Sequence, residues 1–427
     1  MSQNRFERTE HLLVPLISRE GADQGHGRKV RLLLWVLKQL SYIYRSVVQL
    51  RLFLYNRGIF RHHALGCQVI SVGNLTVGGT GKTPVVEVFA RELQREGRRV
   101  AILSRGYKKK VPGVLKRIVD RITFGDRRRP PRVVSDGKKL LLDSAMSGDE
   151  PYMLASNLPD VAVLVDKNRV KSGRYAINKL GCDTLILDDG FQYLSLRHRQ
   201  EIVLVDRTNP FGNRHVLPRG ILREPIKNIT KASFVFLTKS DGKNSSSLKK
   251  EIRSLNPKAE IIECRHCARY LQNVVSKERE HLDYLSGLNI VVLSGIAAPG
   301  GFENELEERG SRILERFRFV DHHRYTQQEL LDIINTAERL RAQAIVTTEK
   351  DAVRFPKLDR CDVPVYFLRV DIEILTGEED FRDCISRVCF RTGSRGGRAK
   401  EVSSPDNEDV AVEEAPEREK AAEVVPA

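Results

Sequence analysis

The sequence predicts an α/β protein with a doubly wound, largely parallel sheet and a second, smaller α/β domain. Four short runs of β-branched and other apolar residues, at 161–166, 184–190, 201–206 and 233–241, alternate with helix-like segments. Continuous apolar runs of this length are typical of strands that are buried on both faces of a parallel sheet. Another alternation of strand-like and helix-like segments begins near Leu288. This second alternation indicates the smaller domain.

Composition divides the chain of 427 residues into further parts. The predicted parts are a disordered extension at 1–28, a helix at 29–60, a core domain at 61–275 with a basic insertion at 108–147, the smaller domain at 288–390, and a disordered acidic tail at 391–427. The net charge of +16 favours an anionic partner. No basic and aromatic residues interleave as in a base-stacking surface, so we expect no specific nucleic acid partner. The sequence identifies no protein partner.

The cysteine content and the first residues indicate a compartment. Seven cysteines, an odd number, are scattered along a long chain, which favours reduced thiols in the cytosol. The polar start MSQNRFERTE has no cleavable apolar segment, so we expect no secretion. Cys264 and Cys267 flank His266 with metal-ligand spacing, but no second pair completes a tetrahedral site. Whether these cysteines bind a metal stays open.

The helix at 29–60 is apolar with a basic stripe. Arg31, Lys38 and Arg45 are spaced by sevens and fall on nearly one face, with Gln49 close to it. The basic residues leave apolar segments shorter than the ~18 residues that cross a bilayer. We therefore predict a helix that lies in a membrane interface, with its cations toward lipid phosphates. The alternative is an ordinary helix packed on the protein's own core.

A glycine-rich loop follows the first apolar run, in ISVGNLTVGGTGKTPVVEVFA from Ile70. Glycines lack a Cβ, so the backbone can curl and point its N–H groups at anionic oxygens. Lys82 can then reach the outer phosphates of a nucleotide, and Thr83 can bind Mg²⁺ at the start of a helix. These features predict a P-loop NTPase-like core. The predicted nucleotide-binding residues of the loop are Thr76, Gly78, Gly79, Thr80, Gly81, Lys82 and Thr83.

The strict loop pattern has glycine where this chain has Thr76. A glycine-rich turn with a chance GKT is therefore the alternative interpretation. The flanking strand and helix patterns favour the phosphate loop.

Asp188 and Asp189 end the apolar run TLIL. A P-loop fold places the carboxylate that holds Mg²⁺ at such a strand end. Two adjacent carboxylates concentrate negative charge that a divalent ion relieves. The alternative is an Asp-Asp-Gly turn with both acids in water.

Three further polar motifs are candidates for chemistry. Asp149 of GDEP opens a predicted helix, where a helix N-cap is the simpler interpretation. The DHH motif at Asp321 presents two histidines, which suit proton transfer or lie on a surface loop. The motif TTEKD at Thr347 either faces a ligand or caps the next helix. TKSD at Thr238 instead resembles a guanine-selecting motif, which keeps a P-loop GTPase of the metallochaperone or maturation-factor type as the alternative function.

Taken together, the ordered motifs resemble one family. VGNLTVGGTGKTPVV, SRGY, GDEP, DDGFQ, FGNRHVLPRGILRE, DHH and TEKDAV occur in the order found in the tetraacyldisaccharide 4′-kinases of Gram-negative bacteria. The resemblance covers approximately residues 30–375, and the family's own loop has the form seen at Thr76. It implies transfer of the γ-phosphate of ATP to the 4′-hydroxyl of a tetraacylated glucosamine disaccharide 1-phosphate in lipid A biosynthesis.

The resemblance also implies roles for individual residues. Asp149 would activate the sugar hydroxyl together with His322, the histidine that directly follows Asp321. ATP and Mg²⁺ would be the cofactors. Nucleotide contacts would further come from Gln192 and Arg223, and metal ligands would be Thr83, Asp188, Asp189 and Glu224. The family commonly has histidine where this chain has Tyr193, so a role of that imidazole cannot be transferred.

Finally, the resemblance implies partners and a location. The partners would be the acylated disaccharide lipid and an anionic membrane surface. The protein would lie peripherally on the cytoplasmic face of the bacterial inner membrane.

Overall fold

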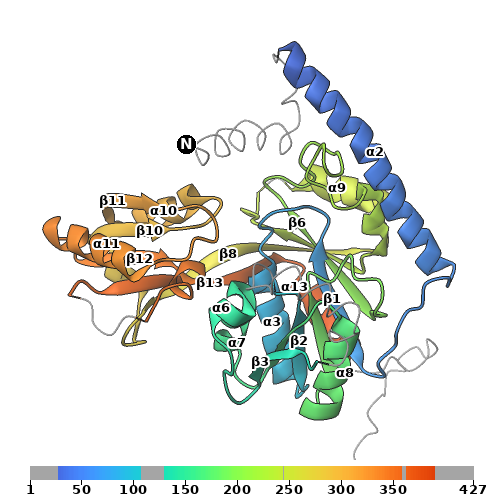
Figure 1. Ribbon diagram of the computed structural model, residues 1–427, viewed down its shortest axis with the longest axis horizontal. Helices are drawn as coiled ribbons and strands as arrows, with labels where there is room; N and C mark the ends of the chain where they lie inside the picture. The colour runs from blue at the N-terminus through green and yellow to red at the C-terminus, as the bar shows by residue number, and fades with distance from the viewer. Residues whose placement is uncertain (1–26, 107–128, 244, 358–361, 390–427) are drawn as a thin grey trace, which may run out of the picture. The chain divides into compact units, whose positions relative to one another are not determined.

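Strands from both halves of the chain join one 13-stranded sheet in the computed structural model, which describes residues 27–106, 129–243, 245–357 and 362–389 (Figure 1). The strand order is β11-β10-β12-β13-β8-β7-β6-β1-β5-β2-β4-β3, with β9 paired to β8. The predicted tail lies outside the described residues, as does the predicted extension except for its last two positions. Residues 107–128 of the predicted basic insertion also lie outside them.

The first half of the sheet is parallel from β8 to β4. Its strands are β1 (Gln68–Asn74), β2 (Val100–Ser104), β4 (Ala162–Val165), β5 (Thr184–Asp188), β6 (Gln200–Asp206) and β7 (Phe234–Thr238). Their apolar residues are almost entirely buried, as the continuous apolar runs predict. The doubly wound, largely parallel sheet expected from the sequence is therefore present.

One strand was not expected. β3 (Arg132–Asp136) pairs antiparallel with β4 at the edge of the sheet, within the predicted basic insertion at 108–147, for which no strand was predicted. Only Val133 and Val134 make its short run apolar, and basic residues precede it, so the sequence carries no strand pattern there. The end of that segment thus belongs to the sheet.

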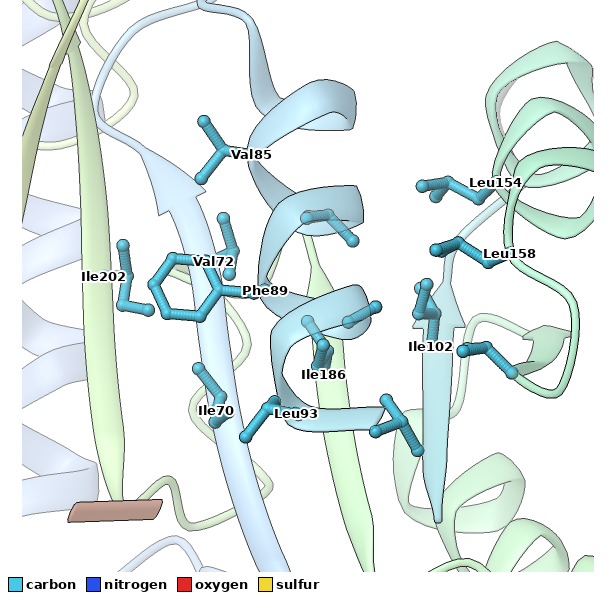
Figure 2. Close-up of a cluster of buried hydrophobic side chains, with 14 of the residues drawn as sticks. Ile70, Val72, Val85, Phe89, Leu93, Ile102, Leu154, Leu158, Ile186 and Ile202 are labelled. Atoms are coloured by element: carbon cyan, nitrogen blue, oxygen red, sulfur yellow. The ribbon is translucent and has the colours of Figure 1, made fainter. Parts of the chain in front are cut away.

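Helices cover the parallel strands. They are α3 (Lys82–Arg95), α6 (Ser144–Ser147), α7 (Asp149–Asn157), α8 (Arg169–Leu180) and α9 (Ser246–Leu255), with a 3-10 helix η1 (Ile226–Lys231). Figure 2 shows Val85, Phe89 and Leu93 of α3 beside apolar residues of β1 and β6. Leu154 of α7 and Leu158, the residue after that helix, belong to the same buried cluster. Since Phe89 and Leu93 are fully buried, this packing fixes where α3 begins, directly after the glycine-rich loop.

The second half of the chain extends the same sheet. Its elements are β8 (Glu260–Asn273), β9 (Arg279–Glu280), η2 (Leu282–Leu285), β10 (Asn289–Ser294), α10 (Pro299–Glu308), β11 (Arg312–Arg318), α11 (Gln327–Arg339), β12 (Ala344–Thr348), α12 (Glu349–Ala352), β13 (Val365–Thr376) and α13 (Glu378–Cys389). Strands β10 to β13 pair in parallel, and β13 joins β8 antiparallel. The two α/β alternations expected from the sequence are thus connected through one long antiparallel pair.

The N-terminal helix α2 (Arg28–Asn56) presents two different faces. On one face Ser41 Oγ donates to Val216 O at 2.8 Å, and Tyr44 Oη donates to Arg223 O at 3.1 Å. The opposite side exposes large apolar residues. Within the described residues, none of the helices, α2 included, combines the length and apolar character that a membrane crossing requires.

Candidate active site

The glycine-rich loop runs from the end of β1 to the start of α3. Gly78 and Gly81 have φ values of +121° and +77°, a region that residues with a Cβ rarely adopt. A Cβ at Gly81 would also lie 2.7 Å from Nε2 of His266. The loop therefore needs glycine at Gly81 for both reasons. It ends at the N-terminus of α3, where free N–H groups favour an anion.

The remaining loop residues are held by neighbouring side chains. Asn74 Nδ2 donates to Thr76 O at 2.8 Å, and Thr238 Oγ1 donates to Thr80 O at 2.9 Å. The hydroxyl of Thr80 is buried without a hydrogen-bond partner in the described part of the chain. A buried hydroxyl without a partner beside a phosphate loop fits a group that binds a phosphate oxygen.

Asp189 lies at the centre of the predicted phosphate contacts. Arg223 Nη1 donates to both Asp189 oxygens at 2.8 Å, and Lys82 Nζ is 3.7 Å from Oδ1. Burial acts to raise the pKa of Asp189, but the charges of Lys82 and Arg223 hold it below its usual value. Gln192 Oε1 accepts a hydrogen bond from Arg223 Nη1 at 3.4 Å, and Gln192 Nε2 donates to Asn74 O at 3.0 Å. The structure thus brings Lys82, Asp189, Gln192 and Arg223 together.

Asp188 is buried beside them. Its Oδ2 accepts a hydrogen bond from Ser104 Oγ at 2.8 Å. Burial raises the pKa of Asp188 to about 6, and the negative charges of Glu150 and Asp189 add to the effect. A carboxylate that is buried next to other negative charges is stabilised by a nearby cation.

The oxygen donors of Thr83, Asp188 and Asp189 fit Mg²⁺, which prefers oxygen ligands and keeps several waters or phosphate oxygens. No group of three or more His, Cys, Asp and Glu side chains suited to a metal occurs among the described residues, and a phosphate-bound Mg²⁺ does not require one. Glu224 is held elsewhere, by Asn228 Nδ2 at 2.7 Å and Lys231 Nζ at 2.9 Å. Its role as a metal ligand stays a prediction.

Arg169 is a neighbour that sequence reasoning missed. It is only 5% exposed, and its Nε has no hydrogen-bond partner within the described residues. Its guanidinium lies 4.9 Å from the ring centre of Tyr193, whose Oη accepts the Arg169 backbone N–H at 3.0 Å. Tyr193 thus orders Arg169 close to the charges of Asp188 and Asp189. The arginine has no local motif that would have indicated this.

The second predicted group is centred on Asp149, the first residue of α7. Gly148, with φ +96°, is the N-cap, so Asp149 is not the cap. Oδ2 of Asp149 lies 3.2 Å from Nδ1 of His322, which has a left-handed backbone with φ +66°. His323 instead stacks on Phe319 and contacts Glu329. His322 rather than His323 therefore faces Asp149.

Two arginines that the sequence did not indicate also contact Asp149. Arg354, with a fully buried side chain, donates from Nε to Oδ2 at 2.8 Å, and Arg324 Nη2 lies 3.2 Å from Oδ1. Burial acts to raise the pKa of Asp149, but His322, Arg354 and Arg324 together lower it. Asp149 is therefore ionised at neutral pH.

Arg354 also constrains the imidazole. Its Nη2 lies 3.2 Å from Nδ1 of His322. Guanidinium nitrogens only donate, so this contact needs Nδ1 without a proton, whereas a hydrogen bond from Nδ1 to ionised Asp149 needs the proton there. The position of one proton thus decides which partner Nδ1 binds.

The N-terminus of α7 connects the two groups. Asp149 faces His322, and the next residue, Glu150, is near enough to Asp188 for its charge to raise that pKa. Lys350 lies 3.8 Å from Glu150 and 3.7 Å from Asp321. The predicted base and the predicted metal site therefore share one neighbourhood.

A family profile described as "Tetraacyldisaccharide-1-P 4′-kinase" matches residues 33–389 of the chain. The chain belongs to this tetraacyldisaccharide 4′-kinase family. The match spans the glycine-rich loop, α7 and the DHH motif. The resemblance expected from the motifs is thereby confirmed.

Individual relatives agree with this 4′-kinase membership. The tetraacyldisaccharide 4′-kinase of Anaeromyxobacter sp. (strain K) is 39% identical over 345 residues, which cover 79% of this chain and 85% of that protein. The enzyme of the same name from Syntrophus aciditrophicus is 37% identical over 348 residues, 79% of this chain and 89% of that protein. The crystal structure of LpxK from Aquifex aeolicus in complex with ATP is 29% identical, with a TM-score of 0.63, and covers 84% of this chain and 100% of that one. The predicted fold class is confirmed.

Several alternatives lose support. In TKSD, Asp241 pairs with Arg207 at 2.7 Å on the surface, and Lys239 pairs with Asp206. The 4′-kinase relatives do not favour the GTPase interpretation.

The thiol of Cys264, one of the two cysteines with metal-ligand spacing, is buried on β8, and this burial raises its pKa to about 12. In the TTEKD motif, Thr348 caps α12.

Proposed function

We propose that this protein transfers the γ-phosphate of ATP to the 4′-hydroxyl of a tetraacylated glucosamine disaccharide 1-phosphate. The family's name, which states a 4′-kinase of a tetraacyldisaccharide 1-phosphate, supports this proposal. The observation that carries the proposal is the shared neighbourhood of the two residue groups at α7. Lys82, Asp189 and Arg223 lie at the end of the glycine-rich loop. Asp149 contacts His322, and the next residue, Glu150, is near enough to Asp188 for its charge to raise the pKa of Asp188.

The positive groups of the loop would act on the phosphates. Phosphoryl transfer needs alignment and positive charge more than covalent chemistry from the protein. Lys82, Arg223 and Arg169 would supply charge, and Gln192 would hold Arg223 in place. Thr83, Asp188 and Asp189 would hold Mg²⁺, which neutralises phosphate charge when bound.

The Asp149 group would act on the hydroxyl. As the sugar oxygen bonds to the γ-phosphorus and the bond to the ADP oxygen breaks, the hydroxyl proton passes to Oδ2 of Asp149. Arg354 favours an unprotonated Nδ1 on His322. Nδ1 then accepts a single hydrogen bond, so the newly protonated carboxyl donates to Nδ1 in place of Arg354 Nη2, and the pair holds the proton.

The acylated substrate gives α2 its role. Each buried CH₂ contributes about 0.8 kcal/mol to membrane binding, so a lipid with four acyl chains stays in the bilayer. We infer that the exposed apolar face of α2 lies in an anionic membrane surface and that the protein is peripheral on the cytoplasmic face of the inner membrane. The exposure of Leu32, Ile43 and Val47, each 60% or more, supports this inference.

The direct test supplies labelled ATP and the disaccharide lipid in mixed micelles. With the parent protein we expect label on the sugar at the 4′ position. With Asp149→Asn we expect kcat to fall about 100-fold or more, because asparagine has the shape of aspartate but cannot accept the hydroxyl proton. Arg339, an exposed residue of α11, provides a control through Arg339→Gln. Parent protein that leaves the lipid unlabelled would contradict the function, and full activity of Asp149→Asn would remove Asp149 from the chemistry.

A further inference from the structure

A cavity of about 200 Å³ lies between α2 and the segment 214–227. Its walls include Lys38 and Arg45 of α2, and Arg214, His215 and Lys227 of the facing segment. This volume is several times the ~30 Å³ that one water molecule occupies in the liquid. The cavity therefore has room for a phosphate group and part of what the phosphate is attached to.

The charged side chains that line this cavity are basic. Among the residues that the structure describes, no acidic side chain lines it. Glu251 pairs with Arg214, but Lys38, Arg45 and Lys227 make no ion pair or side-chain hydrogen bond in the described part of the chain. Cations gathered around a hollow repel one another, and an anion bound among them removes that cost. The lining thus selects a negatively charged ligand.

The position of the cations on α2 indicates what carries the negative charge. Successive helix residues are about 100° apart, which places Lys38 and Arg45 on the flank between buried Ser41 and exposed Tyr42. Beyond Tyr42 the exposed side continues as the apolar face of α2, formed by Leu32, Leu33, Trp35, Val36, Leu40, Tyr42, Ile43, Val47, Leu50 and Phe53. An anion in the cavity would therefore lie at the border of an apolar surface, as a lipid phosphate does.

We propose that this cavity binds the phosphate group of a membrane amphiphile whose acyl chains lie along the apolar face of α2. Lys38, Arg45 and Lys227 hold the phosphate oxygens, and Ser41 lines the buried side of the cavity. Two sources share this chemistry: the headgroup of an anionic phospholipid and the 1-phosphate of the substrate. The second source rests on the proposed function.

The site is also placed to communicate with the nucleotide. Arg223, which holds Asp189, is two residues from Pro225 in the cavity wall. Its carbonyl accepts the hydrogen bond from Tyr44, on the same helix as Lys38 and Arg45. A lipid bound here thus contacts the two elements that support Arg223.

The first experiment measures binding without turnover. The full chain and its Lys38→Ala/Lys227→Ala variant are titrated with short-chain phosphatidylglycerol below its critical micelle concentration, and with vesicles of phosphatidylcholine with or without phosphatidylglycerol. Each lysine would donate charge-assisted hydrogen bonds to the phosphate, which are stronger than neutral ones, so we expect a loss of at least tenfold in affinity for the phospholipid and for anionic vesicles. Lys179→Ala/Lys258→Ala, which removes two exposed lysines from α8 and from the turn after α9, is the control for net charge.

The second experiment assigns the source. In detergent micelles without phospholipid, a KM for the disaccharide lipid that rises about tenfold in the double variant, with kcat unchanged, identifies the 1-phosphate as the ligand. Weaker vesicle binding with an unchanged KM identifies a phospholipid headgroup. ATP protection against thermal unfolding, equal in all proteins, verifies the fold. If neither binding nor KM differs from the Lys179→Ala/Lys258→Ala control, the proposal is wrong. An inactive parent protein would contradict the proposed function alone, since the vesicle measurement needs no turnover.

Discussion

Arg354 donates from Nε to Oδ2 of Asp149 at 2.8 Å with its own side chain fully buried. The guanidinium is fixed from behind, because Nη1 donates to Asp351 Oδ1 at 2.9 Å and to Gly295 O at 3.1 Å. Asp351 in turn accepts from Tyr325 Oη at 3.0 Å. The segments that follow β10, precede α11 and follow α12 are thus connected to one carboxylate of α7. Arg354 positions the base that the proposed reaction needs.

Replacing Arg354 should slow the chemical step without weakening nucleotide binding. We expect Arg354→Gln to lower kcat about 100-fold, the cost of misplacing a reacting group, with the KM for ATP unchanged. Arg354→Lys should recover part of the rate, because it restores the charge but reaches fewer partners. Steady-state kinetics in micelles and ATP protection against thermal unfolding measure the two effects. An equal fall in ATP binding would indicate that Arg354 only holds the fold together.

Gly81 offers a test of the phosphate loop. Gly81→Ala places a Cβ 2.7 Å from the His266 ring at a φ of +77°. We expect at least tenfold weaker ATP binding by calorimetry. Gly97→Ala is the matched control, because Gly97 has a φ of +76° with no atom within 4 Å of its Cβ position. Adding His266→Ala to Gly81→Ala should recover part of the affinity by relieving the contact. If Gly81→Ala and Gly97→Ala lose the same ATP affinity, backbone strain alone explains the effect, and the position of Gly81 in the phosphate loop does not.

The local motifs of the sequence predicted the loop, the strand ends and the helices that follow them. An apolar run stops and a helix pattern or a turn begins near Lys82, Thr83 and Asp188. Such boundaries between elements can be recognised in a single sequence. Arg354 and Arg324 had no such signal. Each is one basic residue among the 72 of the chain, and its importance arises from a contact with Asp149, 205 and 175 residues away along the chain.

β3 was missed for a related reason. Its pairing partner β4 supplies the hydrogen bonds, while its own residues alternate too briefly to show a period. The joining of the two α/β halves through β8 and β13 likewise depends on pairing between strands about a hundred residues apart. Hydrophobic patterns along the chain predict single helices and strands well. They do not predict which distant strands pair, and only the folded structure shows this.

Asp188 predicts a pH-dependent stability. Its pKa is raised to about 6 by burial, against an ordinary value of 3.8. Between these values the folded state holds more protons than the unfolded state, so the free energy of unfolding falls as pH rises through this window. With metal removed by a chelator, Asp188→Asn should therefore be more stable than the parent at pH 8, by on the order of 2–3 kcal/mol, and similar to it near pH 4. Denaturant unfolding at both pH values measures this. A variant that is less stable than the parent at pH 8 would contradict the buried, unrelieved charge.

The apolar face of α2 predicts how the protein partitions. Ile43 is 63% and Val47 60% exposed on the side opposite Ser41, so glutamates there leave the packed face of the helix intact. In a membrane interface the same change places charge among acyl chains and near anionic headgroups, which is unfavourable. We expect Ile43→Glu/Val47→Glu to lower co-sedimentation with anionic vesicles at least tenfold while ATP protection is unchanged. Leu331→Glu on α11, another exposed apolar position at 44%, is the matched control and should sediment as the parent does. Equal sedimentation of all three proteins would mean that α2 takes no part in membrane binding and that the lipid reaches Asp149 by another surface.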